Sequence, residues 1–201
     1  MTRVIELLRE ALRLLESTEE SPTYSVESLS ERKIAWGTLV SPLFKERVLW
    51  MADALECSPD HLMACMHWES GGTFRADIKN AAGSGATGLI QFMPTTAKGL
   101  GTTTALLAKM TPEDQLNYVY KYFRPNAGRL HNLGDVYMSI LWPKGRGQPD
   151  HYVLFDKKKM PTTFRQNAGL DVNKDGLVTR AECLVKVNER LARGLEKGNI
   201  G

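Results

Sequence analysis

The sequence has no long apolar run, and no stretch approaches the ~20 consecutive apolar residues that a membrane-spanning helix needs. An excess of one charge is also missing, because 26 Lys and Arg stand against 23 Asp and Glu, a formal net charge of +3. Proteins that bind nucleic acid mainly through phosphate contacts usually carry a larger, clustered basic excess. We therefore expect no transmembrane segment and no nucleic-acid partner.

Cysteine is scarce, since the chain has only three, Cys57, Cys65 and Cys183, and their spacing matches no metal site. They indicate small buried side chains in a reduced compartment and exclude a disulfide scaffold. The N-terminus carries acidic residues within its apolar stretch and no small-residue cleavage site, which is not the pattern of a secretory signal. With 201 residues, 42% of them apolar, the chain is long enough for one globular domain with a sizeable core.

Residues 1–30 are expected to form an amphipathic helix and a polar linker. Apolar side chains recur at helical spacing from Val4 to Leu15, with charged residues between them. The segment 16–22 that follows is polar and contains no large apolar residue. We expect the helix to dock on the domain or on a partner, although its pattern also suits a membrane surface.

The next segment, residues 31–160, is predicted to be a mainly helical domain. Three hydroxyl-proline pairs, Ser41-Pro42, Ser58-Pro59 and Thr111-Pro112, each offer a capping side chain followed by a proline, which the first helical position tolerates. Apolar residues recur at spacings of three and four within 43–55, 62–66 and 116–123. Only residues 86–92 suit a short strand, and residues 143–170 are expected to be loop with little regular structure.

Glu69 stands at the end of the second of these helices, where the apolar pattern calls for a hydrophobic residue. It shares a face with Leu62, Cys65 and Met66, and Gly71-Gly72 should end the helix directly after it. Desolvation and the negative end of the helix dipole would both raise the pKa of a carboxyl at this position, as a general acid requires. The alternative is a glutamate whose side chain turns to solvent where the helix frays.

The glycine-rich segment that follows suits a turn that lines a cleft. Gly83, Gly85 and Gly88 let the backbone approach a ligand closely, and Gln91 can donate and accept hydrogen bonds. An ordinary flexible turn would have a similar composition.

These two segments together carry a family resemblance. His67-Trp68-Glu69-Ser70-Gly71-Gly72, then Gly85-Ala86-Thr87-Gly88-Leu89-Ile90-Gln91 and Pro94-Thr95-Thr96-Ala97, resemble the soluble lytic transglycosylases and goose-type lysozymes. The resemblance covers about residues 41–145 and implies a lysozyme-like helical domain with a short hairpin beside a cleft for peptidoglycan glycan strands. It implies Glu69 as the catalytic acid and base. The substrate contacts it implies are Ser70, Gly88, Leu89, Gln91, Tyr137 and Trp142.

Two positions depart from the family pattern. Ala82 stands where many members have a serine, and the Ala-Tyr-Asn-Ala-Gly signature is replaced by residues 137–145, with Trp142 in the apparent place of the tyrosine. Segments similar to 137–145 occur in transglycosylase-like domains of bacteriophage tail and virion proteins.

The number of carboxylates decides between two reactions. Hydrolysis of a glycoside usually needs a second acid, and Asp77 is the candidate, although it also suits a solvated loop. The resemblance implies a route with one carboxylate, in which Glu69 protonates the glycosidic oxygen and then removes the proton of the muramic acid 6-hydroxyl, giving a 1,6-anhydro sugar. We expect this lytic transglycosylation, with hydrolysis as the alternative. Trp68, Phe74, Tyr118 and Tyr122 suit either the core or the cleft.

The last segment, residues 161–201, is predicted to hold a structural Ca²⁺ ion in a single EF-hand-like loop, packed with a C-terminal helix on the catalytic domain. Residues 171–182 follow the loop pattern at its demanding positions, with Gly176 at the sharp turn. Thr179 suits the cap of the following helix, whereas Pro161 and Gly169 leave little room for a helix before the loop. The candidate ligands are Asp171, Asn173, Asp175, Leu177, Thr179 and Glu182.

We therefore expect a peptidoglycan-degrading enzyme that cleaves the β-1,4 bond between N-acetylmuramic acid and N-acetylglucosamine. An enzyme without its own export signal needs lysis or a particle to reach the cell wall. This favours a bacteriophage enzyme, either an endolysin or a virion-associated enzyme that docks on virion proteins through its N-terminal helix. It would be made in the cytoplasm of an infected bacterium and act in the periplasm or cell wall. A non-catalytic murein-binding module and a structural virion component are the other interpretations.

Overall fold

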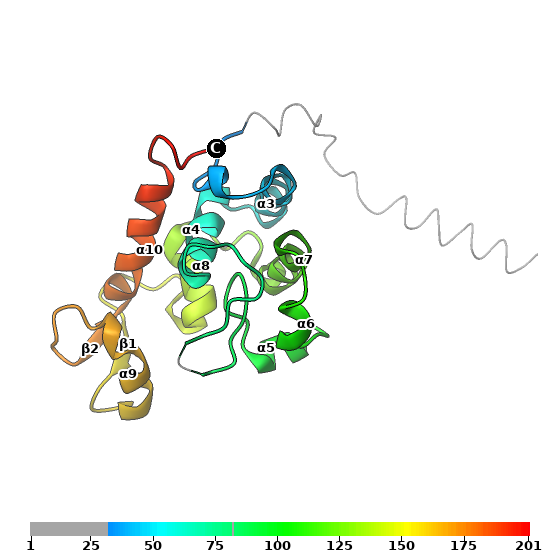
Figure 1. Ribbon diagram of the computed structural model, residues 1–201. Coiled ribbons are helices and arrows are strands. Elements are labelled where there is room, and N and C mark those ends of the chain that lie inside the picture. Colours follow the sequence, from blue (N-terminus) through cyan, green and yellow to red (C-terminus); the bar gives the residue numbers. More distant parts are fainter. Residues whose placement is uncertain (1–31, 82) are drawn as a thin grey trace, which may run out of the picture. The chain divides into compact units, whose positions relative to one another are not determined.

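The computed structural model describes residues 32–81 and 83–201, which are built mainly from α-helices (Figure 1). The helix and linker expected within residues 1–30, and Ala82, lie outside the described residues. Residues 32–201 form one unit. None of its helices has both the length and the apolar character needed to cross a membrane. The helices are α3 (Pro42–Leu55), α4 (Pro59–Glu69), α5 (Pro94–Gly99), α6 (Thr104–Leu107), α7 (Pro112–Phe123), α8 (Leu133–Leu141), α9 (Pro161–Asn167) and α10 (Arg180–Gly194).

The helix starts follow the hydroxyl-proline pairs. The Ser41 hydroxyl accepts a hydrogen bond of 3.1 Å from the Phe44 amide, and Thr111 caps α7 in the same way. A proline occupies the first turn after each cap, where its missing N–H costs no helical hydrogen bond. Ser58 precedes α4 as expected, but its side chain forms no capping hydrogen bond.

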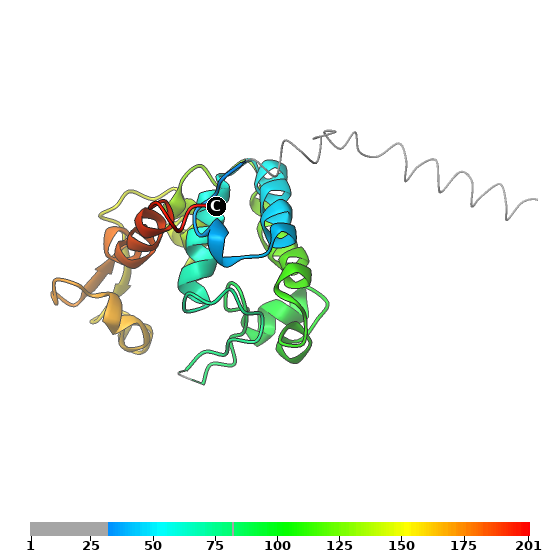
Figure 2. The ribbon, with the colours of Figure 1, turned by 45° about the horizontal axis from the view of Figure 1, so that its top comes forward.

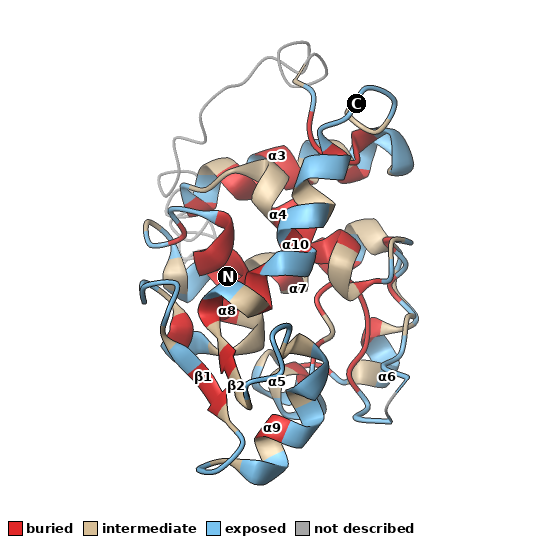
Figure 3. Ribbon diagram, turned by 90° about the vertical axis from the view of Figure 1, so that its left-hand side faces the viewer, coloured by how far each residue is buried: buried red, intermediate tan, exposed pale blue. Residues whose placement is uncertain are grey.

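The centre of the fold is α4. All residues from Leu62 to His67 are buried, so this helix is covered on every side. It packs against α3, α8 and α10 (Figures 1 and 2). Figure 3 shows the buried residues concentrated on α4 and α8, while α10 presents exposed residues on its outer side. The last residue of α4, Glu69, is therefore held by a buried helix at the centre of the unit.

The C-terminal helix α10 is fixed to α4 through Trp36. The Trp36 ring stacks on His67 with 3.8 Å between ring centroids, and its indole nitrogen donates a hydrogen bond of 2.9 Å to the Arg190 carbonyl. Gly194 leaves room for the ring, because a Cβ there would lie 2.5 Å from the indole nitrogen. As expected, Thr179 caps α10, in a capping box with Glu182.

Two expectations about regular structure were wrong. Residues 86–92 form no strand and contain only isolated bridges through Thr87, because positive φ angles at Gly88 and Gln91 turn the chain. Residues 143–170 are not mainly loop, since they contain β1 (Val153–Asp156), α9, and the 3₁₀-helices η3 (Pro143–Gly145) and η4 (Ala168–Leu170). Strand β1 pairs antiparallel with β2 (Leu177–Thr179), a partner distant in sequence, and Pro161 is tolerated at the start of α9.

The unit is thus a mainly helical, lysozyme-like domain with one small antiparallel sheet of two strands, β1 and β2. Its three cysteines are free, with Cys65 and Cys183 buried and Cys57 half-buried. The remaining 3₁₀-helices of the described residues are η1 (Gly37–Leu39) and η2 (Arg124–Asn126).

Candidate active site

Glu69 is the last residue of α4, and a glycine turn follows it. Gly71 and Gly72 both have positive φ, and the Gly72 amide donates a hydrogen bond of 2.7 Å to the His67 carbonyl. A Cβ at Gly72 would lie 3.3 Å from the His67 ring, so a side chain there would meet both strain and crowding. The sequence therefore ends the helix directly after the carboxylate and leaves one side of Glu69 open.

The Glu69 side chain is half-buried, and no described residue forms a hydrogen bond or an ion pair with its carboxylate. Burial raises the pKa of this carboxyl to about 8. Glu69 is therefore mainly protonated at neutral pH, as a group that donates a proton to a leaving oxygen must be. The expected pKa rise at this position agrees with the geometry.

Glu69 opens into a cavity of about 590 Å³. The walls come from the end of α4, the segment 78–81, helix α8, the segment 166–170 and helix α10. Among the described residues that line it, Glu69 is the only acid, and Lys79 and Lys186 are the cations. The other lining residues are Trp68, Gly71, Ile78, Asn80, Ala81, Gln91, Tyr137, Leu141, Gln166, Asn167, Gly169 and Leu170.

Tyr137 lies in this cavity and is bound to the residue next to Glu69. The indole nitrogen of Trp68 donates a hydrogen bond of 3.0 Å to the Tyr137 hydroxyl. Burial and the nearby Glu69 charge raise the pKa of Tyr137 well above its usual range, so it keeps its own proton. The nearby Tyr122 donates a hydrogen bond of 2.6 Å to the Ser139 carbonyl and does not line the cavity. Of the tyrosines considered from the sequence, the structure brings Tyr137 to Glu69's cavity.

The glycine-rich segment reaches the cavity at one residue. Gln91 lines the cavity, and its amide nitrogen donates hydrogen bonds to the carbonyls of Ile78, at 3.2 Å, and Gly88, at 3.1 Å. Gly88 and Leu89 do not line it, and Leu89 is fully buried. We therefore interpret Gly88 and Leu89 as supports of the wall and not as sugar contacts.

Gln115, which sequence reasoning missed, fixes the segment that contains Gly88 and Leu89. This buried side chain accepts a hydrogen bond of 2.7 Å from the Leu89 amide and donates to the carbonyls of Ala76 and Leu107. A Cβ at Gly88 would lie 2.2 Å from the Gln115 oxygen, so only glycine fits there. In the sequence, the only sign of this role was a polar residue next to the apolar Leu116 in α7. That pattern does not distinguish a buried amide side chain from an exposed one.

Two other candidate substrate contacts lie outside the cavity. Ser70 is fully buried, and its hydroxyl accepts a hydrogen bond of 3.0 Å from the Phe74 amide, which shapes the turn after α4. Trp142 packs edge-on against Phe155 of β1 with 5.2 Å between ring centroids. Phe74 itself is buried against Phe44, so it belongs to the core.

Asp77, the candidate second carboxylate, is not among the lining residues. Its side chain is exposed and forms hydrogen bonds of 2.9 and 2.7 Å with the Arg75 guanidinium. These hydrogen bonds lower the pKa of Asp77 and keep it ionised as a surface ion pair. Asp77 therefore has no place beside a sugar bound at Glu69 in this geometry.

The loop 171–182 has features that suit a cation. Gly176 has a φ of +85° and donates its amide to one Asp171 oxygen at 3.1 Å. The other Asp171 oxygen, Oδ1, is buried and has no hydrogen-bond partner. Leaving such an atom unsatisfied costs on the order of 1–3 kcal/mol or more, and a bound Ca²⁺ would satisfy it. The remaining candidate ligands also offer only oxygen atoms, as calcium prefers.

The same loop does not gather its acidic side chains around one point. Within residues 32–81 and 83–201, no three His, Cys, Asp or Glu side chains converge closely enough to hold a metal ion. Glu182 instead accepts hydrogen bonds from the amides of Val172, at 3.1 Å, and Thr179, at 2.9 Å. The oxygen ligands and the unsatisfied Asp171 oxygen thus fit calcium. To bind the ion, the Glu182 carboxylate would have to give up its hydrogen bonds to the amides of Val172 and Thr179.

The loop is joined directly to the cavity. Residues 166, 167, 169 and 170, which form part of the cavity wall, lie in α9 and η4 immediately before Asp171. Helix α9, for which the sequence left little room, thus forms and contributes to the cavity. Strand β2, which includes the seventh to ninth loop positions, is paired with β1. Any ordering of the loop would therefore act on this part of the cavity wall.

Comparison with curated proteins gave no match for this chain. Residues 50–140 do match a family model, which includes Glu69, Gln91 and Tyr137 and ends before Trp142 and the loop 171–182. The family consists of enzymes that cleave glycosidic bonds in peptidoglycan. The match supports the resemblance to lytic transglycosylases and lysozyme-like proteins that the residues around Glu69 carry. The matching model is that of the transglycosylase SLT domain.

Proposed function

We propose that this protein cleaves the β-1,4 bond between N-acetylmuramic acid and N-acetylglucosamine in peptidoglycan by lytic transglycosylation. The observation that carries the proposal is the cavity around Glu69, in which this residue is the only acid among the described lining residues and has a pKa of about 8. A hydrolase of the usual kind needs a second carboxylate close enough to act on the same sugar. The candidate for that role, Asp77, is engaged with Arg75 at the surface.

In the proposed reaction Glu69 serves twice. Its protonated carboxyl gives the proton to the glycosidic oxygen, and the bond from that oxygen to C1 of the muramic acid breaks. The resulting Glu69 carboxylate then takes the proton from the 6-hydroxyl of the same sugar, and O6 bonds to C1. The carboxyl is restored, and no water is consumed. Positive charge that develops at C1 favours a neighbouring carboxylate in the second half of the reaction.

The other residues of the cavity support this chemistry by position. Trp68 and Tyr137 fix the end of α4 through their hydrogen bond, so the carboxyl is held at one place. Gln91 keeps the segment 78–81 against the glycine-rich turn, which sets the width of the cavity on that side. Its amide oxygen offers an acceptor for sugar hydroxyl and acetamido groups.

The experiment is digestion of purified peptidoglycan by the full chain and by two variants. We expect soluble products whose masses are one water lower than those of hydrolysed muropeptides. Glu69→Gln should abolish them, whereas Asp77→Asn, the matched removal of the exposed carboxylate, should leave yield and mass unchanged. Hydrated products, lost in both variants, would identify a hydrolytic muramidase with Asp77 as second acid. Binding of murein without products from any form would leave a non-catalytic murein-binding component.

We further propose that loop 171–182 binds one structural Ca²⁺ ion. Asp171, Asn173, Asp175, Leu177, Thr179 and Glu182 would hold it, and the ion would supply charge neutralisation and order to the loop. Support comes from the unsatisfied, buried Asp171 oxygen. Because residues 166–170 precede the loop and line the cavity, calcium would also fix that wall for substrate.

The test of the calcium site is thermal unfolding of the full chain in EDTA and in Ca²⁺. A ligand at about 100 times its Kd stabilises the folded state by ~2.7 kcal/mol, so calcium should raise Tm by several degrees. The rise should disappear in Asp171→Asn and persist in Asp77→Asn, which removes a carboxylate from a different surface loop. An equal rise in both variants, or no rise in the unmodified chain, would contradict the proposal.

The biological setting is also a proposal. The likeness of residues 137–145 to segments of phage virion domains supports a bacteriophage enzyme, an endolysin or a virion-associated enzyme, that acts on the cell wall from the periplasm or from the particle. Residues 1–30 would be the part that docks on virion proteins. Incorporation of a tagged chain into phage particles, with and without residues 1–30, distinguishes the virion enzyme from a free endolysin.

A further inference from the structure

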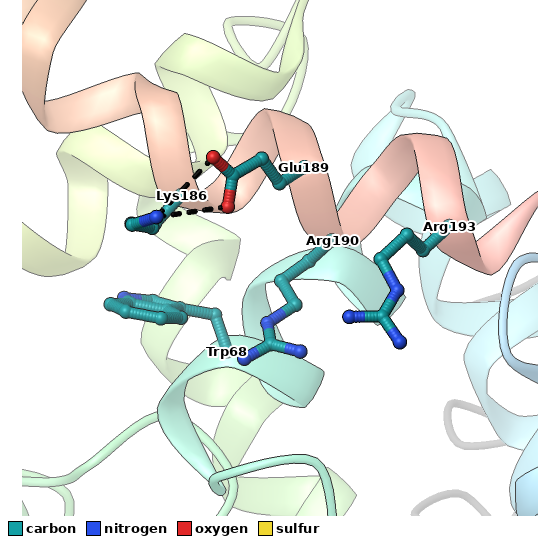
Figure 4. A pocket seen from close by; sticks show the side chains of 5 residues that line it. All are labelled: Trp68, Lys186, Glu189, Arg190 and Arg193. Carbon is teal, nitrogen blue, oxygen red and sulfur yellow. Dashed lines mark hydrogen bonds and ion pairs between the residues drawn. The ribbon is translucent and has the colours of Figure 1, made fainter.

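Three cations on α10 line a small pocket beside the catalytic cavity. Lys186, Arg190 and Arg193 are spaced by four and three residues, so they lie along one stripe of the helix. The pocket has a volume of about 210 Å³ and is completed by Glu189 and by Trp68 of α4. Figure 4 shows the three basic side chains extending from α10 on the side where Trp68 lies.

The positive charge of this pocket is only partly neutralised. Lys186 forms an ion pair of 3.1 Å with Glu189. Arg190 and Arg193 form no ion pair with any acid among the described residues. Both guanidinium groups act on His67, whose pKa falls to about 4 through burial first and then through the charges of Arg190 and Arg193. The pocket therefore holds two uncompensated positive charges.

One of these cations is held in place before any ligand binds. The Arg190 guanidinium lies 5.7 Å from the ring centroid of Trp68, a cation–π contact that limits its rotamers. Arg190 is also half-buried, while Arg193 is exposed at the pocket mouth. A planar guanidinium fixed in this way can bind a carboxylate with two parallel hydrogen bonds and at low entropic cost. Solvated surface cations usually lack such a support.

The pocket and the catalytic cavity share two lining residues, Trp68 and Lys186. Trp68 directly precedes Glu69 in α4, so the basic pocket begins one residue from the acid that would protonate the glycosidic oxygen. A ligand with a sugar ring at Glu69 and an anionic arm can reach both. The glycan chain itself is neutral apart from the peptide stem that the lactyl group of each muramic acid carries. Free carboxylates on that stem are the anions nearest to the scissile bond.

We propose that the pocket formed by Trp68, Lys186, Glu189, Arg190 and Arg193 binds a carboxylate of the peptide stem on the muramic acid in the cavity. The inference rests on the proposed peptidoglycan substrate and adds a preference for peptide-bearing over peptide-free glycan. Arg190 and Arg193 would supply the charge-assisted hydrogen bonds, and Lys186 would lie between sugar and stem. These residues would therefore determine specificity without taking part in bond cleavage.

The kinetic test compares glycan strands that carry their stems with stem-free strands, from which an amidase has removed the peptide and whose freed lactyl carboxylate has been capped as a methylamide. We expect the unmodified chain to prefer the stem-bearing strands. The double variant Arg190→Gln/Arg193→Gln should lower kcat/KM on these strands by about 10- to 100-fold, mainly through KM, because hydrogen bonds to charged groups are lost. On stem-free strands its kcat/KM should equal that of the unmodified chain. Arg193→Gln alone, at an exposed position, should show a smaller loss of the same kind.

The matched control is Lys158→Gln/Lys197→Gln, which removes two exposed cations outside the pocket and changes the net charge equally. This control variant should leave kcat/KM unchanged on stem-bearing and on stem-free strands. Equal losses on both substrates in the arginine variant would indicate a structural role and overturn the proposal, as would a lack of preference in the unmodified chain. Inhibition by polyglycerol phosphate without any dependence on the stem would assign the cations to a phosphate polymer of the wall and also overturn it.

A binding measurement separates this inference from the proposed function. In the Glu69→Gln background, a GlcNAc-MurNAc disaccharide with its peptide should bind about 10-fold or more tightly than the same disaccharide whose lactyl carboxyl is capped as a methylamide in place of the peptide. Equal affinity for the two ligands would overturn the stem site while leaving the peptidoglycan substrate in place. Binding of neither ligand would remove the substrate and, with it, the stem site.

Discussion

The indole nitrogen of Trp68 donates a hydrogen bond of 3.0 Å to the hydroxyl of Tyr137, and this bond joins the end of α4 to the middle of α8. Both residues line the cavity around Glu69, and Glu69 directly follows Trp68. The Glu69 carboxylate itself has no hydrogen-bond partner among the described residues. Its position is therefore set through its neighbour and not by direct contacts, which keeps its pKa high while restricting its movement.

Removal of that hydroxyl should affect kcat more than KM. Tyr137→Phe leaves the Trp68 N–H without an acceptor, which costs on the order of 1–3 kcal/mol and loosens the end of α4. We expect kcat on peptidoglycan to fall at least ~10-fold with KM nearly unchanged, because misplacement of a reacting group lowers the rate of the chemical step. Tyr122→Phe removes a comparable hydrogen bond, to Ser139, outside the cavity and should retain kcat. Similar kcat values for the two variants would argue against a positioning role for Tyr137.

Replacement of Glu69, the proposed catalytic acid, should stabilise the folded protein. The pKa of Glu69 is about 8 in the folded state against a reference of 4.5, so the folded state binds this proton more tightly than the unfolded state does. Folding stability is therefore lost as pH rises from 4.5 to about 8 and is fully present below that window. Glu69→Gln carries no such proton, and at pH 8 its unfolding free energy should exceed that of the parent by on the order of a few kcal/mol.

Urea unfolding of both proteins at pH 5 and pH 8 measures this difference. The gap between variant and parent should widen with pH, whatever the contributions of other groups such as His67, because those are common to both proteins. A gap that does not change between the two pH values would show that Glu69 titrates normally.

Activity should fall with pH only above neutrality. Glu69 must begin the reaction protonated, so kcat/KM should be constant near pH 6 and fall as pH rises through about 8. With no second carboxylate in the described cavity wall, no loss of a required base is expected between pH 5 and 7. Rates on peptidoglycan from pH 5 to 9.5 give the profile. A bell shape with an acidic limb inside that range would indicate a second catalytic acid or base.

The glycine at position 88 should be irreplaceable for a local steric reason. A Cβ there lies 2.2 Å from the Gln115 oxygen, and φ is +86°, so Gly88→Ala suffers both a clash and backbone strain. We expect a loss of at least ~3 kcal/mol in unfolding free energy, or failure to fold. Gly83→Ala has similar strain at φ +74° but no atom within 4 Å, and should lose only ~1–2 kcal/mol. Equal losses of unfolding free energy in the two variants would show that backbone strain alone, and not the clash with Gln115, determines the cost.

Local patterns in the sequence were enough to predict helices α3, α4, α7 and α10 and the position of Glu69. Ser41 and Thr111 begin helices at the expected residues because capping and the proline that follows act within one turn. Glu69 was identifiable because an acid at an apolar position of a short helix is an exception within a strong pattern. The raised pKa follows from that placement alone, and burial is its cause in the structure.

Long-range partners were not predictable in the same way. Strand β1 exists because it pairs with β2, and nothing in its four residues indicates a partner that begins 21 residues after β1 ends. Gln115 satisfies three backbone groups from separate segments, which no local pattern encodes. For the same reason Gly88, Leu89 and Ser70 were assigned to substrate, although the structure places them behind the cavity wall.

The central claim is that one carboxyl, Glu69, cleaves the glycan without water, and digestion of peptidoglycan in H₂¹⁸O tests it most directly. Lytic transglycosylation forms the new bond to the sugar's own O6, so the reducing-end muramic acid should carry no ¹⁸O from solvent and should lack one water. Mass spectra of the released products, taken immediately after digestion, report both properties. Anhydro products without label are the expected result. Incorporation of one ¹⁸O at C1 of each new end would contradict the claim.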